Sequence, residues 1–443
     1  MNNKKKQPKK SEKDNASPLG KIKAPSDYTA QLIALCAQAR ESGRSLSVSS
    51  AEVRNNALRC MADALEQSQD DILFRNEIDV EAGRRSGLSS AMLDRLSLTG
   101  RRITDMAQSL REVADLPDPL AEVVDRWERP NGLKIEKVRV PLGVVAMIYE
   151  ARPNVTVDAT GLCLKSGNAV VLRGGKEALD SNTALVQAMK KGLTRAGVSP
   201  HVVQFVETSD RSVIRDLVRM DRFVDLVIPR GGEEMVTAIR EMATVPVLSH
   251  GKGLCSVYVD KEADLAMAES VALNAKIQRP GVCNAMETLL IHQDVAPSFV
   301  PVMVKALAEN NVTVRGDALS QQWGGASVLP SQPSDYDTEF LDLELAMKVV
   351  GSLRDAIAHI NHHGSHHSDA IITQNEETAR CFLAEVDSAA VFVNASTRLH
   401  DGGVMGLGSE MGISTQKLHA RGSMGVRELT TTKYLIRGTG QIR

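Results

Sequence analysis

The first 120 residues carry a hydrophobic pattern of helical period. Between 28 and 40, and again between 49 and 67, apolar residues recur at three- and four-residue spacing, which is the period of a helix with one buried face. Ser49, followed three residues later by Glu52, has the form of a capping box at a helix start. We therefore expect a helix in each segment, the second one beginning at Ser49.

The pattern changes between 121 and 140, where short strand-like runs flank Pro130, Asn131 and Gly132. Turn residues between two such runs predict a β-hairpin. The last regular segment, TTKYLIRG at 431–438, also has strand character. We expect the hairpin and this strand to form a small extension through which chains associate by strand addition.

From Gly167 onward, strand and helix patterns alternate. Strands are predicted at NAVVLRG (168–174), VVQFVET (202–208), VDLVIPRGG (224–232) and VPVLSH (245–250), with a helix between each strand and the next. A second alternating region runs from LCSVYVD (254–260) through a helix at 263–277 and the strand LLIH (289–292) to VFVNAST (391–397). Successive strand–helix units imply parallel sheets, which bind ligands at the carboxyl ends of their strands.

The predicted fold class is therefore α/β, with two parallel-sheet α/β domains plus a small oligomerisation extension. The expected boundaries are a disordered lysine-rich tail at 1–25, a first domain at 26–120 and 139–254, a second domain at 255–420, and the extension at 121–138 and 421–443.

Charge and cysteine usage narrow the class of protein. The chain has 53 Lys and Arg residues against 55 Asp and Glu residues, a net charge of −2, so neither a nucleic acid nor a membrane is an expected partner. No apolar run reaches the roughly 18 residues of a transmembrane helix. The six cysteines show no zinc-type spacing, and without an export signal we expect reduced thiols in the cytoplasm and no metal.

Two glycine turns that follow predicted strands are candidate phosphate cradles. A GxGxxG fingerprint is absent, but RGGK at 173–176 and PRGG at 229–232 each end a strand. Glycines let a backbone approach a phosphate, and a helix N-terminus favours the anion. Arg173 and Lys176 place positive charge at the first turn, which suits the 2′-phosphate of NADP better than NAD. An ordinary strand–helix turn explains either motif equally well.

Cys283 is the candidate nucleophile. It lies in RPGVCNA, between a predicted helix and a predicted strand, where proline and glycine fix the backbone and expose the thiol. Reactive cysteines occupy exposed positions of this kind, whereas structural ones sit inside apolar runs, as Cys163 does in GLCLKSG. Both readings of Cys283 stay open on this argument alone.

Longer segments carry a family resemblance. EARPNVTVDATGLCLKSGNAVVLRGG, IPRGG and RPGVCNAMETLL, in this order and followed by Glu339, resemble the aldehyde dehydrogenase superfamily. VPVLSHGKGLCSVYVD and VNASTRLHDGGVMGLGSEMGISTQKLHARGSMGVRELTTTKY resemble, more closely, its γ-glutamyl phosphate reductase family. The resemblance covers about residue 25 to the C-terminus.

The resemblance implies roles for individual residues. Cys283 matches the nucleophile, Asn154 the amide that holds the oxyanion, and Glu339 the carboxylate that binds the nicotinamide ribose. The first domain would bind the cofactor through Arg173, Lys176, Arg230, Gly231 and Gly232, and the second would be catalytic. Ser396 and Arg398 follow VNA in the stretch that lines the substrate mouth, with Arg152, Arg279 and Arg421 as further partners for a carboxylate.

The implied reaction is the NADPH-dependent reduction of L-glutamate 5-phosphate to L-glutamate 5-semialdehyde, with release of phosphate, through a thioester on Cys283. It is the second step of proline biosynthesis. The site should lower the pKa of the Cys283 thiol. A homodimer or larger assembly is expected, as is transient contact with a separate glutamate 5-kinase that makes the labile substrate.

Other functions stay open. Hydrolytic aldehyde dehydrogenases carry a glutamate that activates water, but here Leu248 takes its place in LSHGK. A CoA-acylating enzyme and a non-catalytic scaffold bound to nucleic acid by its lysine tail are further alternatives. His250 is a proton donor or a turn residue. The histidine-rich stretch HINHHGSHH at 359–367 is expected to be a solvated helix end that binds no metal.

Overall fold

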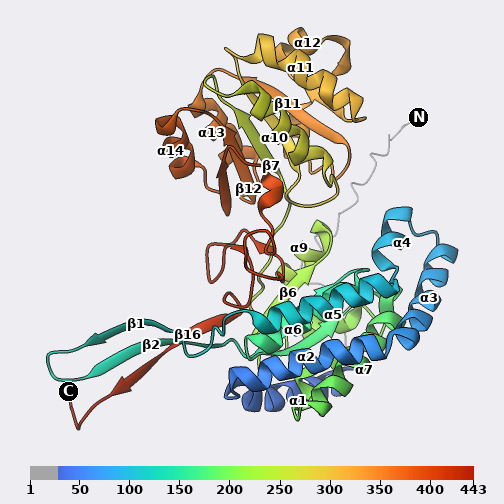
Figure 1. Ribbon diagram of the computed structural model, residues 1–443, viewed down its shortest axis with the longest axis vertical. Helices are drawn as coiled ribbons and strands as arrows, with labels where there is room; N and C mark the ends of the chain where they lie inside the picture. The colour runs from blue at the N-terminus through green and yellow to red at the C-terminus, as the bar shows by residue number, and fades with distance from the viewer. Residues whose placement is uncertain (1–27) are drawn as a thin grey trace, which may run out of the picture.

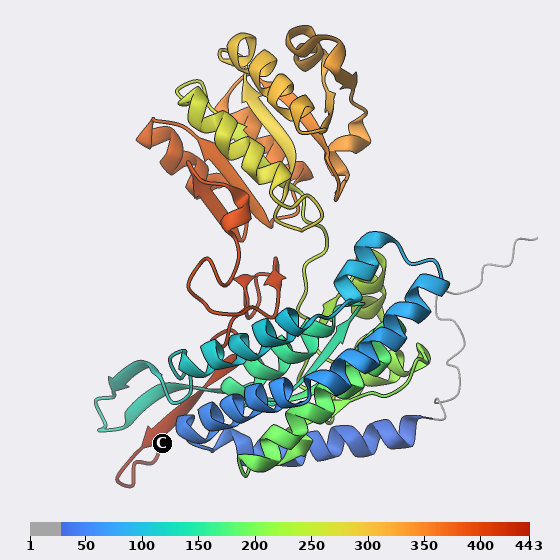
Figure 2. The same ribbon diagram turned by 45° about the vertical axis from the view of Figure 1, so that its right-hand side comes forward.

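The computed structural model describes residues 28–443, so the predicted tail at 1–25 lies outside the described residues. Figure 1 shows two α/β bodies, one above the other, and a β-ribbon that projects from the lower body. In Figure 2, turned by 45°, extended segments again connect the two bodies. The predicted α/β class with two parallel-sheet domains and an extension is confirmed. Within residues 28–443, no helix is both long and apolar enough to cross a membrane.

The lower body is built on a four-stranded parallel sheet in the order β5-β4-β3-β6. Strands β3 and β4 are buried along their whole length, as is usual for a parallel sheet covered by helices. The strands are β3 (Val144–Tyr149), β4 (Ala169–Arg173), β5 (Val203–Phe205) and β6 (Leu226–Arg230). The helices are α1 (Thr29–Ser47), α2 (Ala51–Gln67), α3 (Gln69–Arg85), α4 (Ser90–Leu96), α5 (Gly100–Asp115), α6 (Pro153–Lys165), α7 (Leu179–Arg195), α8 (Ser212–Leu217) and α9 (Glu233–Met242).

The upper body is built on a seven-stranded parallel sheet in the order β10-β9-β11-β8-β7-β12-β13. Its central strand β8 is buried at all seven residues. The strands are β7 (Cys255–Val259), β8 (Met286–His292), β9 (Thr313–Gly316), β10 (Val328–Pro330), β11 (Glu344–Val350), β12 (Ser368–Ile372) and β13 (Ala390–Val393). The helices are α10 (Leu265–Ile277), α11 (Ala296–Glu309), α12 (Ala318–Gly324), α13 (Leu353–His363) and α14 (Glu376–Glu385).

The projecting ribbon is an antiparallel sheet of β1 (Val123–Glu128), β2 (Lys134–Pro141) and β16 (Thr430–Arg437). The predicted turn closes the β1–β2 hairpin: Arg129 N donates to Leu133 O at 2.9 Å. Gly132 adopts φ +85° there, a conformation that glycine reaches without strain. After β13 the chain passes through the short pair β14 (Ile413–Ser414) and β15 (Gly422–Ser423) before β16. The C-terminal segment therefore ties the upper body to the ribbon.

Three local predictions were wrong. The N-cap of α2 is Ser50, whose hydroxyl accepts from Val53 N, while the Ser49 hydroxyl donates to the preceding helix at Leu46 O. The segment VPVLSH forms a single bridge, Val227 to Val247, instead of a strand. Strand β8 begins at Met286, three residues before the predicted LLIH.

Candidate active site

Cys283 lies in the nucleophile loop, defined here as residues 278–285 between α10 and β8. A fully buried ion pair brackets this loop: Lys276 Nζ lies 2.8 Å from Glu287 Oε2, with exposures of 0% and 1%. A backbone bond from Ala285 N to Val282 O, 3.0 Å, closes a turn around the cysteine. The buried ion pair therefore fixes the two ends of the loop relative to each other.

A glycine allows the loop to pack against the segment before β7. A β-carbon at Gly253 would overlap the carbonyl of Cys283. Gly253 N donates to Glu339 Oε1 at 2.9 Å. The structure therefore brings the predicted ribose carboxylate, Glu339, next to the backbone of Cys283, although 56 residues separate the two in sequence.

The thiol of Cys283 is half-buried and free. Burial raises its pKa to about 11, and the negative charges of Glu410 and Glu339 add to the rise. The Arg230 guanidinium is the charge that opposes it. The expectation that this site lowers the thiol pKa is therefore wrong for the arrangement in the structure, because loss of water outweighs one arginine.

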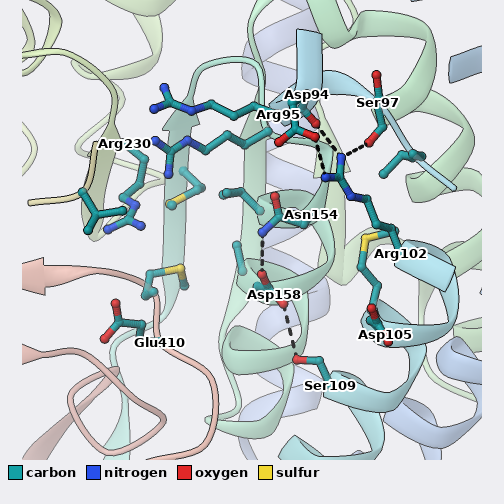
Figure 3. Close-up of a pocket in the computed structure, with 18 of the residues that line it drawn as sticks. Asp94, Arg95, Ser97, Arg102, Asp105, Ser109, Asn154, Asp158, Arg230 and Glu410 are labelled. Carbon is teal, nitrogen blue, oxygen red and sulfur yellow. Dashed lines mark hydrogen bonds and ion pairs between the residues drawn. The ribbon is translucent and has the colours of Figure 1, made fainter. Parts of the chain in front are cut away.

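Asn154 stands in the first turn of α6, which starts with Pro153 at its first position. Its Nδ2 donates to Asp158 Oδ2 at 3.1 Å, and Asp158 also receives the Ser109 hydroxyl at 3.4 Å. Burial raises the pKa of Asp158 to about 6. Figure 3 shows this Asn154–Asp158–Ser109 chain on the wall of a cleft. Since an amide has two N–H donors, one N–H of Asn154 remains for a ligand.

The cleft has a volume of about 660 Å³ and lies between the lower body and the nucleophile loop, within the range usual for small-molecule sites. Asn154, Asp158, Gly281 and Val282 line it. Five arginines also line it: Arg95, Arg102, Arg152, Arg230 and Arg279. Arg230, predicted at a cofactor turn, thus has its side chain in the same cleft as Asn154 (Figure 3).

Arg398 supports the nucleophile loop, and neither Ser396 nor Arg398 lines the cleft. Arg398 contacts the side-chain oxygen of Asn284, and its Nε donates to Gln278 Oε1 at 2.9 Å. Ser396 caps a short turn by accepting from Arg398 N at 3.3 Å. Of the other arginines considered, Arg152 and Arg279 reach the cleft, whereas Arg421 pairs with Asp387 at 2.9 Å.

The two glycine turns have the donors that a dinucleotide requires. Arg173 is buried at the end of β4, with its Nε unpartnered, and Lys176 is exposed three residues later. Gly232 is the N-cap of the ten-residue α9 and has no side-chain cap, and open space surrounds its β-position. A side chain at Gly231 would instead overlap Met235. These residues fit a phosphate-bearing cofactor, although Glu233 and Glu234 also lie in the first turn of α9.

His250 and the histidines of the stretch at 359–367 make contacts within the fold. His250 Nδ1 lies 3.1 Å from Ile413 O of β14, and burial lowers the pKa of His250 to about 4, so the neutral ring contacts the C-terminal segment. In the histidine-rich stretch, α13 ends at His363 with His362 exposed, as predicted, whereas His359 and His367 are buried and not solvated. Within residues 28–443, no three metal-ligating side chains gather at one point.

The profile of the aldehyde dehydrogenase family matches residues 3–329. A γ-glutamyl phosphate reductase of Moorella thermoacetica is 54% identical over 410 residues, 92% of this chain and 97% of that protein. The Carboxydothermus hydrogenoformans reductase is 52% identical, covering 93% and 99%. A crystal structure of the Thermotoga maritima reductase superposes with a TM-score of 0.91 at 44% identity, covering 93% and 99%.

The chain therefore belongs to the aldehyde dehydrogenase family and, within it, to the γ-glutamyl phosphate reductases. It is an oxidoreductase of the nicotinamide-dependent type. An acetylating aldehyde dehydrogenase of Geobacillus thermoglucosidasius shares the fold, with a TM-score of 0.67 at 14% identity.

Sequence reasoning missed two groups at the site. Arg95 belongs to α4, a short helix for which the sequence predicted no site residue, and no local pattern marks it. Asp158 lies four residues after Asn154 on α6, so helical spacing from the predicted amide would have indicated it.

Proposed function

We propose that this chain reduces L-glutamate 5-phosphate to L-glutamate 5-semialdehyde and phosphate, with NADPH as reductant, as the second step of proline biosynthesis. One observation carries the proposal: the free Cys283 stands in a braced loop at a cleft that is rich in arginine. An acyl phosphate is an anionic electrophile, and a thiolate with basic neighbours is suited to attack it. The reductase relatives, 52–54% identical, support the same substrate.

In the first step, the Cys283 thiolate attacks the acyl carbon. The free N–H of Asn154 and backbone N–H groups of the loop hold the oxyanion, an interaction worth about 2.7–4 kcal/mol per donor in comparable sites. Asp158 orients the Asn154 amide by accepting its other N–H. Phosphate leaves, and the acyl group remains on sulfur as a thioester.

The cofactor residues are proposed from their fit. Gly231, Gly232 and Arg230 end β6 at the start of α9, where a pyrophosphate can meet free backbone N–H groups. Arg173 and Lys176 provide charge for a 2′-phosphate, which favours NADPH over NADH. Glu339 is assigned to the nicotinamide ribose. Bound NADPH supplies the hydride that reduces the thioester to the aldehyde.

The site also explains why the thioester is reduced before it is hydrolysed. Leu248 occupies the place of the water-activating glutamate and is 2% exposed. No carboxylate therefore stands at that position to take a proton from water. No observation favours the hydrolytic, CoA-acylating or scaffold alternatives.

The proposed functional division follows the predicted boundaries: an NADPH-binding domain at 26–120 and 139–254, a catalytic domain at 255–420 and an oligomerisation extension at 121–138 and 421–443. The ribbon exposes Val123, Val124, Tyr434 and Ile436, which supports a homodimer formed through it. We also propose a cytoplasmic location and transient contact with glutamate 5-kinase.

The test is Cys283→Ala. NADPH oxidation with glutamate 5-phosphate should fall by about 10⁴-fold or more, since loss of a covalent nucleophile leaves only binding and oxyanion contributions. The control is Cys381→Ala, a half-buried cysteine of α14 that bonds to Glu385, which should retain full activity. A Cys283→Ala enzyme of normal stability that still turns over would contradict the assignment, as would failure to trap a glutamyl adduct on Cys283 by mass spectrometry.

A further inference from the structure

Four guanidinium groups converge on the cleft from four separate places. Arg95 comes from α4, Arg152 from the residue before α6, Arg230 from the end of β6 and Arg279 from the nucleophile loop. Among the residues that the structure describes, none of the four side chains has a hydrogen-bond or ion-pair partner. Arg102, in the same cleft, differs, because it bonds to Asp94 Oδ1 at 2.8 Å (Figure 3).

These four groups repel one another. Burial and the charges of Arg230, Arg95 and Arg279 lower the pKa of Arg152 to about 10. The acids of the same wall, Asp105, Asp158 and Glu410, make no ion pair with any of the four. A cluster of like charges that forms no ion pair with the neighbouring carboxylates costs free energy. Such a cluster is stabilised when a ligand brings the missing negative charge, and its geometry suits a multivalent anion.

The position of the cluster identifies which end of the substrate it meets. Arg279 lies four residues before Cys283 in the nucleophile loop, and Gly281 and Val282 of that loop line the same cleft, so the cluster adjoins the segment that carries the sulfur. In an acyl phosphate, the phosphoryl group is bonded through one oxygen to the carbon that the sulfur attacks. The α-carboxylate of glutamate lies at the other end of the carbon chain. The arginines near sulfur therefore face the phosphoryl group, which also carries the larger charge, about −1.5 to −2 in comparable phosphates.

We propose that Arg95, Arg152 and Arg279 bind the phosphoryl group of the substrate, and that Arg95 is a specificity-determining residue contributed by α4. The inference rests on the proposed function. In the forward direction, the site holds the phosphate as the carbon–oxygen bond breaks. In reverse, an oxygen of bound phosphate attacks the thioester carbon, the carbon–sulfur bond breaks, and Cys283 leaves as the thiolate.

The experiment uses the reverse reaction of the full chain, because it separates acylation from phosphate attack. Mixing L-glutamate 5-semialdehyde with NADP⁺ in the absence of phosphate should give a burst of NADPH, up to one equivalent per Cys283. Inorganic phosphate then permits turnover. The variants are Arg95→Gln and Arg95→Lys. The control is Arg101→Gln, which removes an exposed arginine of α5 that has no partner within residues 28–443 and lies outside the cleft.

Arg95→Gln should raise the KM for phosphate at least tenfold and leave the rate and amplitude of the burst unchanged. The phosphate KM of Arg95→Lys should lie between the values of Arg95→Gln and the wild type. The phosphate KM of Arg101→Gln should match that of the wild type. An unchanged phosphate KM in Arg95→Gln would overturn the inference, and so would a slower burst with normal phosphate dependence, which would place Arg95 at the carboxylate end. A wild type without any burst would overturn the proposed function itself, and this inference with it.

Discussion

The support of the nucleophile loop and the wall of the cleft use similar charged groups in opposite ways. Beneath the loop, Lys276 and Glu287 are fully buried and paired with each other. The Arg398 guanidinium donates hydrogen bonds to Asn284 and Gln278. On the wall, Arg95 and Arg152 have no side-chain partner within residues 28–443, and they face water in the cleft.

The difference shows that the role of a charged side chain in this protein depends on whether the fold supplies its partner. A buried charge that has its partner inside the chain fixes geometry, and removing one partner leaves the other stranded. A charge that the fold holds in place without a partner is available to a ligand. Substitutions beneath the loop should therefore change stability, whereas substitutions on the wall should change kinetics and leave stability almost unchanged.

The largest effect is expected beneath the loop. Lys276→Met should lower the free energy of unfolding by about 3–5 kcal/mol, since it leaves Glu287 buried and unpaired. Burial already raises the pKa of Glu287. A raised native pKa means that stability is lost as pH rises through it, so the deficit should be larger at pH 9 than at pH 5.

Urea unfolding across that pH range measures both effects. The matched control is the double variant Lys276→Met with Glu287→Leu, which should recover most of the lost stability. If Lys276→Met were as stable as the wild type, the claim that charges beneath the loop determine stability would be wrong.

On the wall, Asn154→Ala should lower kcat by about 10²–10³-fold, equivalent to about 2.7–4 kcal/mol, through loss of an oxyanion donor. The exposed side chain contributes little to folding, so thermal unfolding should match the wild type within experimental error. Steady-state kinetics and calorimetry on the same preparation provide the test. A variant that loses stability but keeps its kcat would move Asn154 into the structural group.

The third prediction concerns the alkylation rate of the Cys283 thiol, which should change about tenfold per pH unit. Because the pKa of Cys283 is about 11, the thiolate fraction and the rate of alkylation by iodoacetamide should rise about tenfold per unit between pH 7 and pH 10. Arg230→Gln removes the favourable charge, so its rate should be lower at every pH in this range. A rate that levels off below pH 8 would show that the thiol is activated in the free enzyme.

The smallest effect is expected for Arg398→Gln. Loss of its contacts to Asn284 and Gln278 should cost about 1 kcal/mol of stability, since the group is partly exposed and water replaces its partners. The KM for glutamate 5-phosphate should stay within about twofold, because the side chain does not line the cleft. A large increase in KM with unchanged stability would return Arg398 to the substrate-binding group.

The sequence determined the architecture because its signals are local. The alternation of buried strands with helices predicts two parallel sheets, and the turn at Gly132 predicts the ribbon hairpin. Cys283, Asn154 and Glu339 were also predicted from sequence, by a resemblance that runs through continuous segments. Element ends were less secure: the capping-box spacing from Ser49 to Glu52 favours Ser49, whereas Ser50 caps α2 in the folded chain.

Only the tertiary structure decided what surrounds those residues. Arg95 and Arg279 are 184 positions apart, yet both reach one cleft, and nothing in the chain near Arg95 distinguishes it from an ordinary surface arginine. Whether a charge is paired, and whether a thiol has lost its water, depends on segments that meet through long-range folding. Local pattern fixes where the strands and helices run, whereas electrostatic roles arise from the sum of distant neighbours.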